Sequence, residues 1–258
     1  MVPLTTSGLP CQYCLAMVTP IGPGPLIYAH RGASIDAPDN TLEAFTKAVD
    51  AGADGIELDV RRSSDGVLVL AHDPTFPEFG HVARTSHADI VAAKPSITTL
   101  RAALDAIPPH VFVNVEIKHH FADPGFERLR GIAVDTISLI VEHDEPRRIV
   151  ISSFDHGILT RARKTRSDIL RGLLVTSRTS KLLATQWARL AHHDAVNLDA
   201  RHLRNDPVKT ISRAHHLGLA VVVWTVDEPD EMQRLIDAGV DAIITNDPAT
   251  GRQVVDSR

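Results

Sequence analysis

The 258-residue sequence contains few cysteines, few aromatic residues and no excess of basic charge. Two cysteines cannot form a disulfide framework, so a reducing cytoplasm is the expected compartment. No apolar run approaches the roughly 18 residues that a membrane span requires, and we expect no stable membrane insertion. The formal net charge of -5 argues against a nucleic-acid partner, because proteins that bind nucleic acids usually carry a basic excess.

Residues 1–25 are rich in Pro, Gly and Thr and show no hydrophobic periodicity. They lack the basic start and long apolar core of a secretory signal. Cys11 and Cys14 form a CxxC pair in this segment, but a zinc site would need two further ligands and a redox site a βαβ context. We therefore expect a flexible tail with inert cysteines, followed by one domain over residues 26–258.

From residue 26 onward, short β-rich runs alternate with amphipathic helical stretches. The strand candidates are eight: 26–30, 55–60, 111–118, 149–153, 170–175, 195–199, 220–226 and 241–245. The helix candidates between them are 41–51, 98–107, 126–141, 157–165, 181–191, 207–217 and 228–238. Such alternation predicts parallel strands, and eight units favour a single-domain (β/α)₈ barrel of the TIM type. The alternative is an open doubly wound sheet, but the first strand-to-helix turn is neither a GxGxxG motif nor a P-loop.

Local signals refine this outline. Asn40 is a candidate N-cap for the first helix, with Glu43 completing a capping-box-like pair. Asp227 is a candidate cap for the helix over 228–238. Residues 67–71 predict an additional short strand joined to the second strand by a turn. Residues 72–95 have weak periodicity and predict a loop over the barrel mouth.

Carboxylates gather where a barrel of this type performs its chemistry, at the carboxyl ends of the strands. Glu57 and Asp59 lie on one face of the second strand, and Glu116 lies on the third. Three carboxylates in one mouth repel one another unless a cation lies between them, and oxygen ligands favour one Mg²⁺ or Ca²⁺ ion. A cation held by these residues and flanked by Arg31 and Lys118 describes a site for a phosphate ester.

Acid–base chemistry near neutral pH points to histidine. His30 ends the first strand and His72 follows the short extra strand, so the two rings can divide proton transfer on opposite sides of a phosphorus atom. Six of the other histidines are predicted to lie on the surface: His119, His120, His192, His193, His215 and His216. Taken alone, the Glu57-x-Asp59 pair has another interpretation, a solvated strand edge.

At these residues the sequence resembles the glycerophosphodiester phosphodiesterase family. The matching blocks are HRGAS (30–34), APDNTLEAF (37–45), GIELDVRRSSDGVLVLAHDPT (55–75), VNVEIK (113–118), VVVWTVD (221–227) and GVDAIITNDP (239–248). They occur in the family's order and span about residues 26 to 250. The first block and the ELDV…HD block are highly specific, whereas the last two also occur in other barrels.

The resemblance implies a role for each matching residue. It implies that His30 and His72 are the catalytic acid–base pair and that Glu57, Asp59 and Glu116 hold the metal. It further implies that Arg31 and Lys118 contact phosphate and that Trp224 packs against the glycerol moiety. Trp224 as an ordinary core residue is the alternative. The implied reaction converts a small-molecule glycerophosphodiester, such as glycerophosphocholine or glycerophosphoethanolamine, to sn-glycerol 3-phosphate and an alcohol.

The sequence departs from the family pattern at three places. Asp39 replaces the usual Glu of the PENT motif, which shortens the side chain by one methylene. Asp227 replaces the usual Asn after the tryptophan block, which we interpret as an exchange of helix caps. The region between His72 and Glu116 is shorter than in many members, and head-group preference therefore does not follow from the resemblance.

Two other functions stay open at this point. One is a phospholipase-D-like enzyme that acts on lysophospholipids or sphingolipids, for which Phe76, Pro77 and Phe79 are the candidate apolar surface. The other is a non-catalytic barrel that binds phosphorylated ligands, against which the complete set of histidines and carboxylates argues. The sequence does not indicate an oligomeric state, and it does not choose between Mg²⁺ and Ca²⁺.

Overall fold

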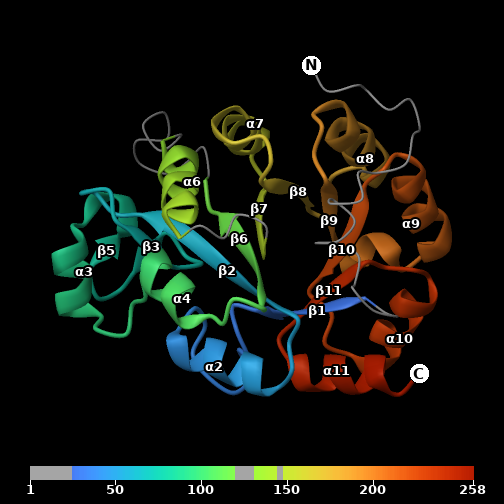
Figure 1. The fold of residues 1–258 in the computed structure, drawn as a ribbon, viewed down its shortest axis with the longest axis horizontal. Coiled ribbons are helices and arrows are strands. Elements are labelled where there is room, and N and C mark those ends of the chain that lie inside the picture. Colours follow the sequence, from blue (N-terminus) through green and yellow to red (C-terminus); the bar gives the residue numbers. More distant parts are fainter. Residues whose placement is uncertain (1–24, 120–130, 144–147) are drawn as a thin grey trace.

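The chain forms a closed barrel of eight parallel strands in a computed structural model that describes residues 25–119, 131–143 and 148–258 (Figure 1). The strands are β1 (Leu26–His30), β2 (Gly55–Arg62), β6 (Phe112–Ile117), β7 (Ile149–Ser153), β8 (Leu170–Val175), β9 (Ala195–Asp199), β10 (Ala220–Trp224) and β11 (Ala242–Thr245). Because β1 pairs with both β11 and β2, the ring closes. The predicted barrel is confirmed, and the open doubly wound sheet is wrong.

Helices surround the barrel on its outer side (Figure 1). They are α2 (Leu42–Asp50), α4 (Leu100–Ala106), α6 (Ile132–Glu142), α7 (His156–Thr165), α8 (Lys181–Leu190), α9 (Pro207–His216), α10 (Pro229–Asp237) and α11 (Pro248–Asp256). Each predicted helix corresponds to one of these, although residues 126–130 of the 126–141 candidate lie outside the described residues, as does the predicted tail up to residue 24. The terminal helix α11 was not predicted, yet it has ordinary start signals, Pro248 in its first turn and an N-cap at Asp247.

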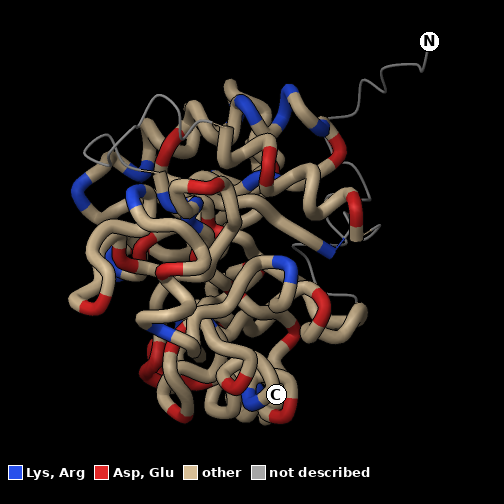
Figure 2. The backbone as a smooth tube through the Cα atoms, turned by 90° about the vertical axis from the view of Figure 1, so that its left-hand side faces the viewer, with Lys and Arg blue, Asp and Glu red and all other residues tan. Residues whose placement is uncertain are grey.

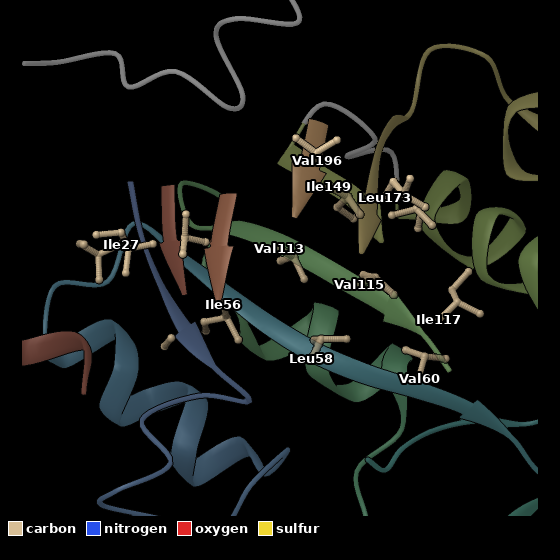
Figure 3. Close-up of a cluster of buried hydrophobic side chains, with 14 of the residues drawn as sticks. Ile27, Ile56, Leu58, Val60, Val113, Val115, Ile117, Ile149, Leu173 and Val196 are labelled. Carbon is tan, nitrogen blue, oxygen red and sulfur yellow. The ribbon is translucent and has the colours of Figure 1, made fainter. Parts of the chain in front are cut away.

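The strand pleat separates two kinds of side chain. Ile56, Leu58 and Val60 alternate along β2 and join the main apolar cluster together with residues of the surrounding helices (Figure 3). Glu57 and Asp59 occupy the intervening positions and therefore point to the inside of the barrel. The burial of the apolar face thus holds the carboxylates in the barrel interior.

The segment after β2 is more ordered than the predicted loop. The predicted extra strand is confirmed as β3 (Leu68–Leu70), antiparallel to β2. It is followed by β4 (Thr75–Phe76), β5 (Gly80–His81), the 3₁₀ turn η1 (Val82–Arg84) and α3 (His87–Ala93), so the prediction of a loop over 72–95 is wrong in secondary structure. Residues 72–75 nevertheless line the cavity at the mouth, as predicted. Phe76 and Phe79 stack with ring centroids 5.0 Å apart and pack on a small cluster of buried residues that contains Ile90. The rings therefore stabilise this excursion.

Candidate active site

Three carboxylates meet at the carboxyl ends of β2 and β6. Glu57, Asp59 and Glu116 are buried and offer oxygen atoms that all lie within 4.8 Å of one another. The register of the parallel pair places Asp59 beside Glu116, which brings residues 57 positions apart in the sequence together. A solvated strand edge at Glu57 and Asp59 is therefore the wrong interpretation, since the two residues are only 3% and 0% exposed.

Two basic side chains lie against this acidic group. Lys118 Nζ is 2.9 Å from Asp59 Oδ1 and 2.5 Å from Glu116 Oε1. Arg31 Nε is 3.1 Å from Asp59 Oδ2, and the backbone N–H of Arg31 donates to Glu57 Oε2. Burial opposes ionisation of Asp59, but Lys118 and Arg31 outweigh it and lower the pKa of that carboxyl.

Glu57 is the carboxylate that these cations compensate least. Burial, together with the charges of Asp59 and Glu116, raises its pKa well above the ordinary range. Its Oε1 is buried and accepts no hydrogen bond from any described residue. Three buried oxygen donors with such an orphaned atom fit a hard divalent cation, which would favour the ionised form of Glu57. These three residues are the candidate ligands.

A hydrogen-bonded relay holds the His30 ring. His30 Nδ1 is 2.7 Å from Asn246 Oδ1, while Asn246 donates through its Nδ2 and backbone N–H to the Asp227 carboxylate. Because Asp227 directs the Asn246 amide oxygen at His30, the ring donates from Nδ1 and keeps a lone pair on Nε2. Nε2 lies 4.0 Å from Glu57. Asp227 is thus not a helix cap, because Glu228 is the N-cap residue of α10.

Asn40 likewise differs from its predicted role. Thr41 caps α2, and Asn40 adopts a positive φ of 59°. Its side chain is buried, accepts from the backbone N–H of Asp59 and donates to Asp59 Oδ2 at 3.0 Å. Asp39 accepts from Arg31 Nη1 at 2.9 Å, so the shorter acid still reaches that side chain. The turn after β1 therefore fixes one carboxylate and one guanidinium of the site.

His72 lines a cavity of about 670 Å³ together with Glu116 and Lys118. Its Nδ1 is 2.8 Å from Asp73 Oδ1, and Arg61 donates to its backbone carbonyl. The side chain is 44% exposed, so the His72 ring faces the mouth whereas the His30 ring is largely enclosed. Burial lowers the pKa of His72, and nearby Lys118 adds to the effect.

Trp224 stands at the end of β10 with its indole N–H donating to the carbonyl of Asn197. Its ring makes an edge contact with Phe154, at a centroid distance of 5.7 Å. Phe154 follows β7, is 42% exposed and lines the cavity. The two rings form an aromatic wall at the mouth. Sequence reasoning missed Phe154, for which the only signal was its position just after a strand.

Two of the histidines predicted to lie on the surface are buried, and for these the prediction is wrong. His119 is 8% exposed and bonds Asp155 at 2.6 Å, because β6 and β7 bring residues 119 and 155 together. His193 is 5% exposed and stacks on His156 at the start of α7. His192, His215 and His216 are exposed as predicted, and His120 lies outside the described residues.

Known proteins with similar sequences and structures share this architecture. A glycerophosphodiester phosphodiesterase of Caldanaerobacter subterraneus is 34% identical over 241 residues, which cover 87% of this chain and 95% of that protein. A crystal structure of a glycerophosphodiester phosphodiesterase from Thermotoga maritima superposes with a TM-score of 0.75 at 24% identity, covering 91% of this chain and 98% of that one. A phosphodiesterase of Oleispira antarctica in complex with the product sn-glycerol-3-phosphate gives 0.78 at 23% identity, over 90% and 97% of the two chains.

The fold, the site and these relatives together define the class of the protein, an enzyme that hydrolyses phosphoric diesters. Residues 30–250 match the model of the glycerophosphoryl diester phosphodiesterase family, a span that holds all the candidate site residues. The chain belongs to that family.

Proposed function

We propose that the protein hydrolyses glycerophosphodiesters such as glycerophosphocholine or glycerophosphoethanolamine to sn-glycerol 3-phosphate and an alcohol. The observation that carries this proposal is the convergence of three buried carboxylates, two basic side chains and His30 at the ends of three adjacent strands. The relative that binds sn-glycerol-3-phosphate supports the product assignment. One Mg²⁺ or Ca²⁺ ion is the proposed cofactor, and the cytoplasm is the proposed compartment.

The two histidines divide the proton transfers. His30 Nε2 accepts the proton of the glycerol 2-hydroxyl as that oxygen attacks phosphorus, and the bond from phosphorus to the head-group oxygen breaks. His72 donates the proton that the departing alkoxide takes. Water then opens the resulting cyclic phosphate with the roles of the rings reversed. The deeply placed ring thus acts near the attacking oxygen, and the exposed ring acts where the alcohol leaves.

The remaining residues bind and orient the diester. Arg31 and Lys118 contact the non-bridging oxygens, and Trp224 with Phe154 packs against the carbon skeleton. Glu57, Asp59 and Glu116 would hold the divalent cation, which when bound offsets charge on the phosphate oxygens. Asn40 and Asp39 keep Asp59 and Arg31 in place through the hydrogen bonds described above.

Product analysis tests the proposal. We expect purified protein with Mg²⁺ or Ca²⁺ to release choline and sn-glycerol 3-phosphate from glycerophosphocholine, and to release choline from lysophosphatidylcholine much more slowly. Faster release from the lysophospholipid would favour the phospholipase-D-like activity instead. Phe76 and Phe79 pack inward on a buried cluster, so they give little support to an apolar lipid-binding surface at the mouth. No metal-dependent hydrolysis of any phosphodiester would contradict both, and would leave a phosphate-binding barrel.

The pH dependence follows from the state of His30. Burial, with a further contribution from Arg31, lowers the pKa of His30 below its ordinary value of 6.5. A general base acts in its neutral form, so kcat/KM at saturating metal should fall on the acid side only as the pH passes through the lowered pKa of His30. The general acid His72 must be protonated, and burial lowers its pKa as well, so an alkaline limb should appear as the pH rises through the pKa of His72. A pH profile of kcat/KM measures this. An acid limb centred above 6.5 would contradict the assignment of His30.

The relay behind His30 gives a separate prediction for Asn246→Leu. This change removes the acceptor of the His30 Nδ1 proton, so the ring loses its fixed tautomer, and kcat should fall by about 10-fold or more while KM changes little. The hydrogen bond to Asn246 also raises the pKa of His30, so the acid limb should move to lower pH in the variant. Ser34→Ala is the matched control, because Ser34 donates to the same amide oxygen. Equal losses in both variants, with no movement of the acid limb, would contradict the relay.

A further inference from the structure

The outer face of α8 has an unusual distribution of side chains. Leu183, Trp187 and Leu190 follow one another at helical spacing and are 61%, 61% and 75% exposed. The residues that α8 buries against the barrel are small, Ala184, Thr185 and Ala188. A surface helix normally turns its large apolar residues inward, whereas α8 exposes its large apolar residues and buries its small ones. A contiguous exposed apolar stripe of this kind marks an interaction surface.

The helix beside it extends this face. The His156 ring of α7 makes an edge contact with the Trp187 ring at 4.9 Å, which places the two helices side by side. Burial, His156 and Arg171 lower the pKa of the His193 ring, just after α8, to about 4, and Arg163 of α7 adds to the effect. We call this surface the α7–α8 face; it comprises the exposed apolar residues Leu183, Trp187 and Leu190 and the exposed basic residues Arg163, Lys164, Arg178 and Arg189.

The charge of the α7–α8 face is opposite to that of the whole protein. Residues 155–194 contain eight lysines and arginines and three aspartates, although the net charge of the chain is -5. Asp168 is paired with Arg166, Asp194 with the buried Arg171, and Asp155 with His119. Four exposed basic residues of the face have no ion pair within the described parts of the chain: Arg163, Lys164, Arg178 and Arg189. By contrast, the side of the molecule with α3 shows both signs interspersed along the chain (Figure 2).

We propose that the α7–α8 face docks the protein peripherally onto an anionic lipid bilayer. A stripe of Leu and Trp flanked by Arg and Lys is the composition that binds the boundary between head groups and acyl chains, while basic residues are attracted to anionic lipids. A second copy of the chain fits less well, because a symmetric contact would bring two strongly basic faces together. Among the described residues no helix is long and apolar enough to cross a bilayer, and docking of this kind needs none.

The position of the face gives the docking a consequence. Thr176, in the connection that leads from β8 into α8, lines the cavity at the barrel mouth. A bilayer in contact with α8 therefore lies beside the entrance of the site. Docking depends only on the residues of the α7–α8 face, so it does not depend on which phosphodiester the enzyme cleaves.

Sedimentation with vesicles tests the proposal on the full chain. We expect the protein to sediment with vesicles of phosphatidylcholine and phosphatidylglycerol in equal parts, to remain in solution with phosphatidylcholine alone, and to dissociate at high salt. Two triple variants should each bind the anionic vesicles at least about 10-fold more weakly than the parent. They are Leu183→Ala/Trp187→Ala/Leu190→Ala and Arg163→Glu/Lys164→Glu/Arg189→Glu. All six positions are solvent-exposed, so circular dichroism should show unchanged folding. The matched control is Arg84→Glu/Val91→Ala, which changes exposed residues of η1 and α3 and should bind like the parent.

Two results would overturn the inference. One is vesicle binding that is absent, or that is equal in the triple variants and the control. The other is a dimer of the parent protein in light scattering without lipid that becomes a monomer in the Leu183→Ala/Trp187→Ala/Leu190→Ala variant, because the face would then be covered by a second copy. We expect every variant to hydrolyse a soluble glycerophosphodiester at the parent's rate, because none of the substituted residues belongs to the candidate active site.

Discussion

His30→Ala and His72→Ala should each lower kcat by a factor on the order of 10² to 10⁴, the range expected when a general acid or base is removed. The His30 ring is held by Asn246 and points Nε2 toward Glu57, and His72 lines the cavity beside Glu116 and Lys118. Neither ring belongs to the apolar clusters, so the free energy of unfolding should change little. Steady-state kinetics and denaturant unfolding of both variants measure the two effects.

A third variant makes the comparison specific. His216→Ala removes an exposed imidazole near the end of α9 and should retain the parent's kcat. The double variant His30→Ala/His72→Ala should be little slower than the slower single variant, because residues that act in one reaction step are not additive. Near-full activity in both single variants would refute the acid–base assignment.

Removal of the metal should have an effect of similar size. EDTA should abolish hydrolysis, and added Mg²⁺ or Ca²⁺ should restore it, because Glu57, Asp59 and Glu116 present buried oxygens to one point. Glu57→Gln keeps the shape of the side chain but loses its negative charge, so half-maximal activity should require a higher metal concentration. Metal titrations of the parent and the variant measure the difference.

The same variant has a readout other than activity. In the absence of metal, Glu57→Gln should not lower the melting temperature, because the substitution removes repulsion from Asp59 and Glu116. Added metal should raise the melting temperature of the parent more than that of the variant, since the cation binds the folded state. Glu43→Gln, at an exposed position of α2, is the matched control and should behave like the parent in both assays. Identical metal responses in Glu57→Gln and the parent would remove Glu57 from the ligand set.

The eight barrel strands were predictable because each is a short β-rich run, and these runs alternate with amphipathic helical stretches along the sequence as the strands alternate with helices in the fold. The strand limits moved by at most two residues, as at β2, which extends to Arg62 where it pairs with β3. The meeting of Glu57, Asp59 and Glu116 was also predictable, because parallel strands bring their carboxyl ends to one edge. In both cases a local periodicity determines the long-range arrangement.

The polar residues behind the site were not predictable in the same way. Asn40 followed by Glu43 has the spacing of a capping box, but Asn40 instead turns into the barrel to bond Asp59, and Thr41 takes the cap. Asp227 likewise precedes a helix as a cap would, yet it bonds Asn246, 19 residues away. Each residue type suits a local and a distant hydrogen bond equally well, and only the closed barrel decides between them.

A crystal structure with a divalent cation and sn-glycerol 3-phosphate would show whether the three carboxylates hold the metal. We expect one cation bonded to oxygens of Glu57, Asp59 and Glu116 at about 2.0–2.6 Å, with the phosphate between it and the Arg31 and Lys118 side chains. His30 Nε2 should lie within hydrogen-bonding distance of the glycerol 2-hydroxyl. A cation bound elsewhere, with these three carboxylates contacting neither metal nor phosphate, would contradict the account.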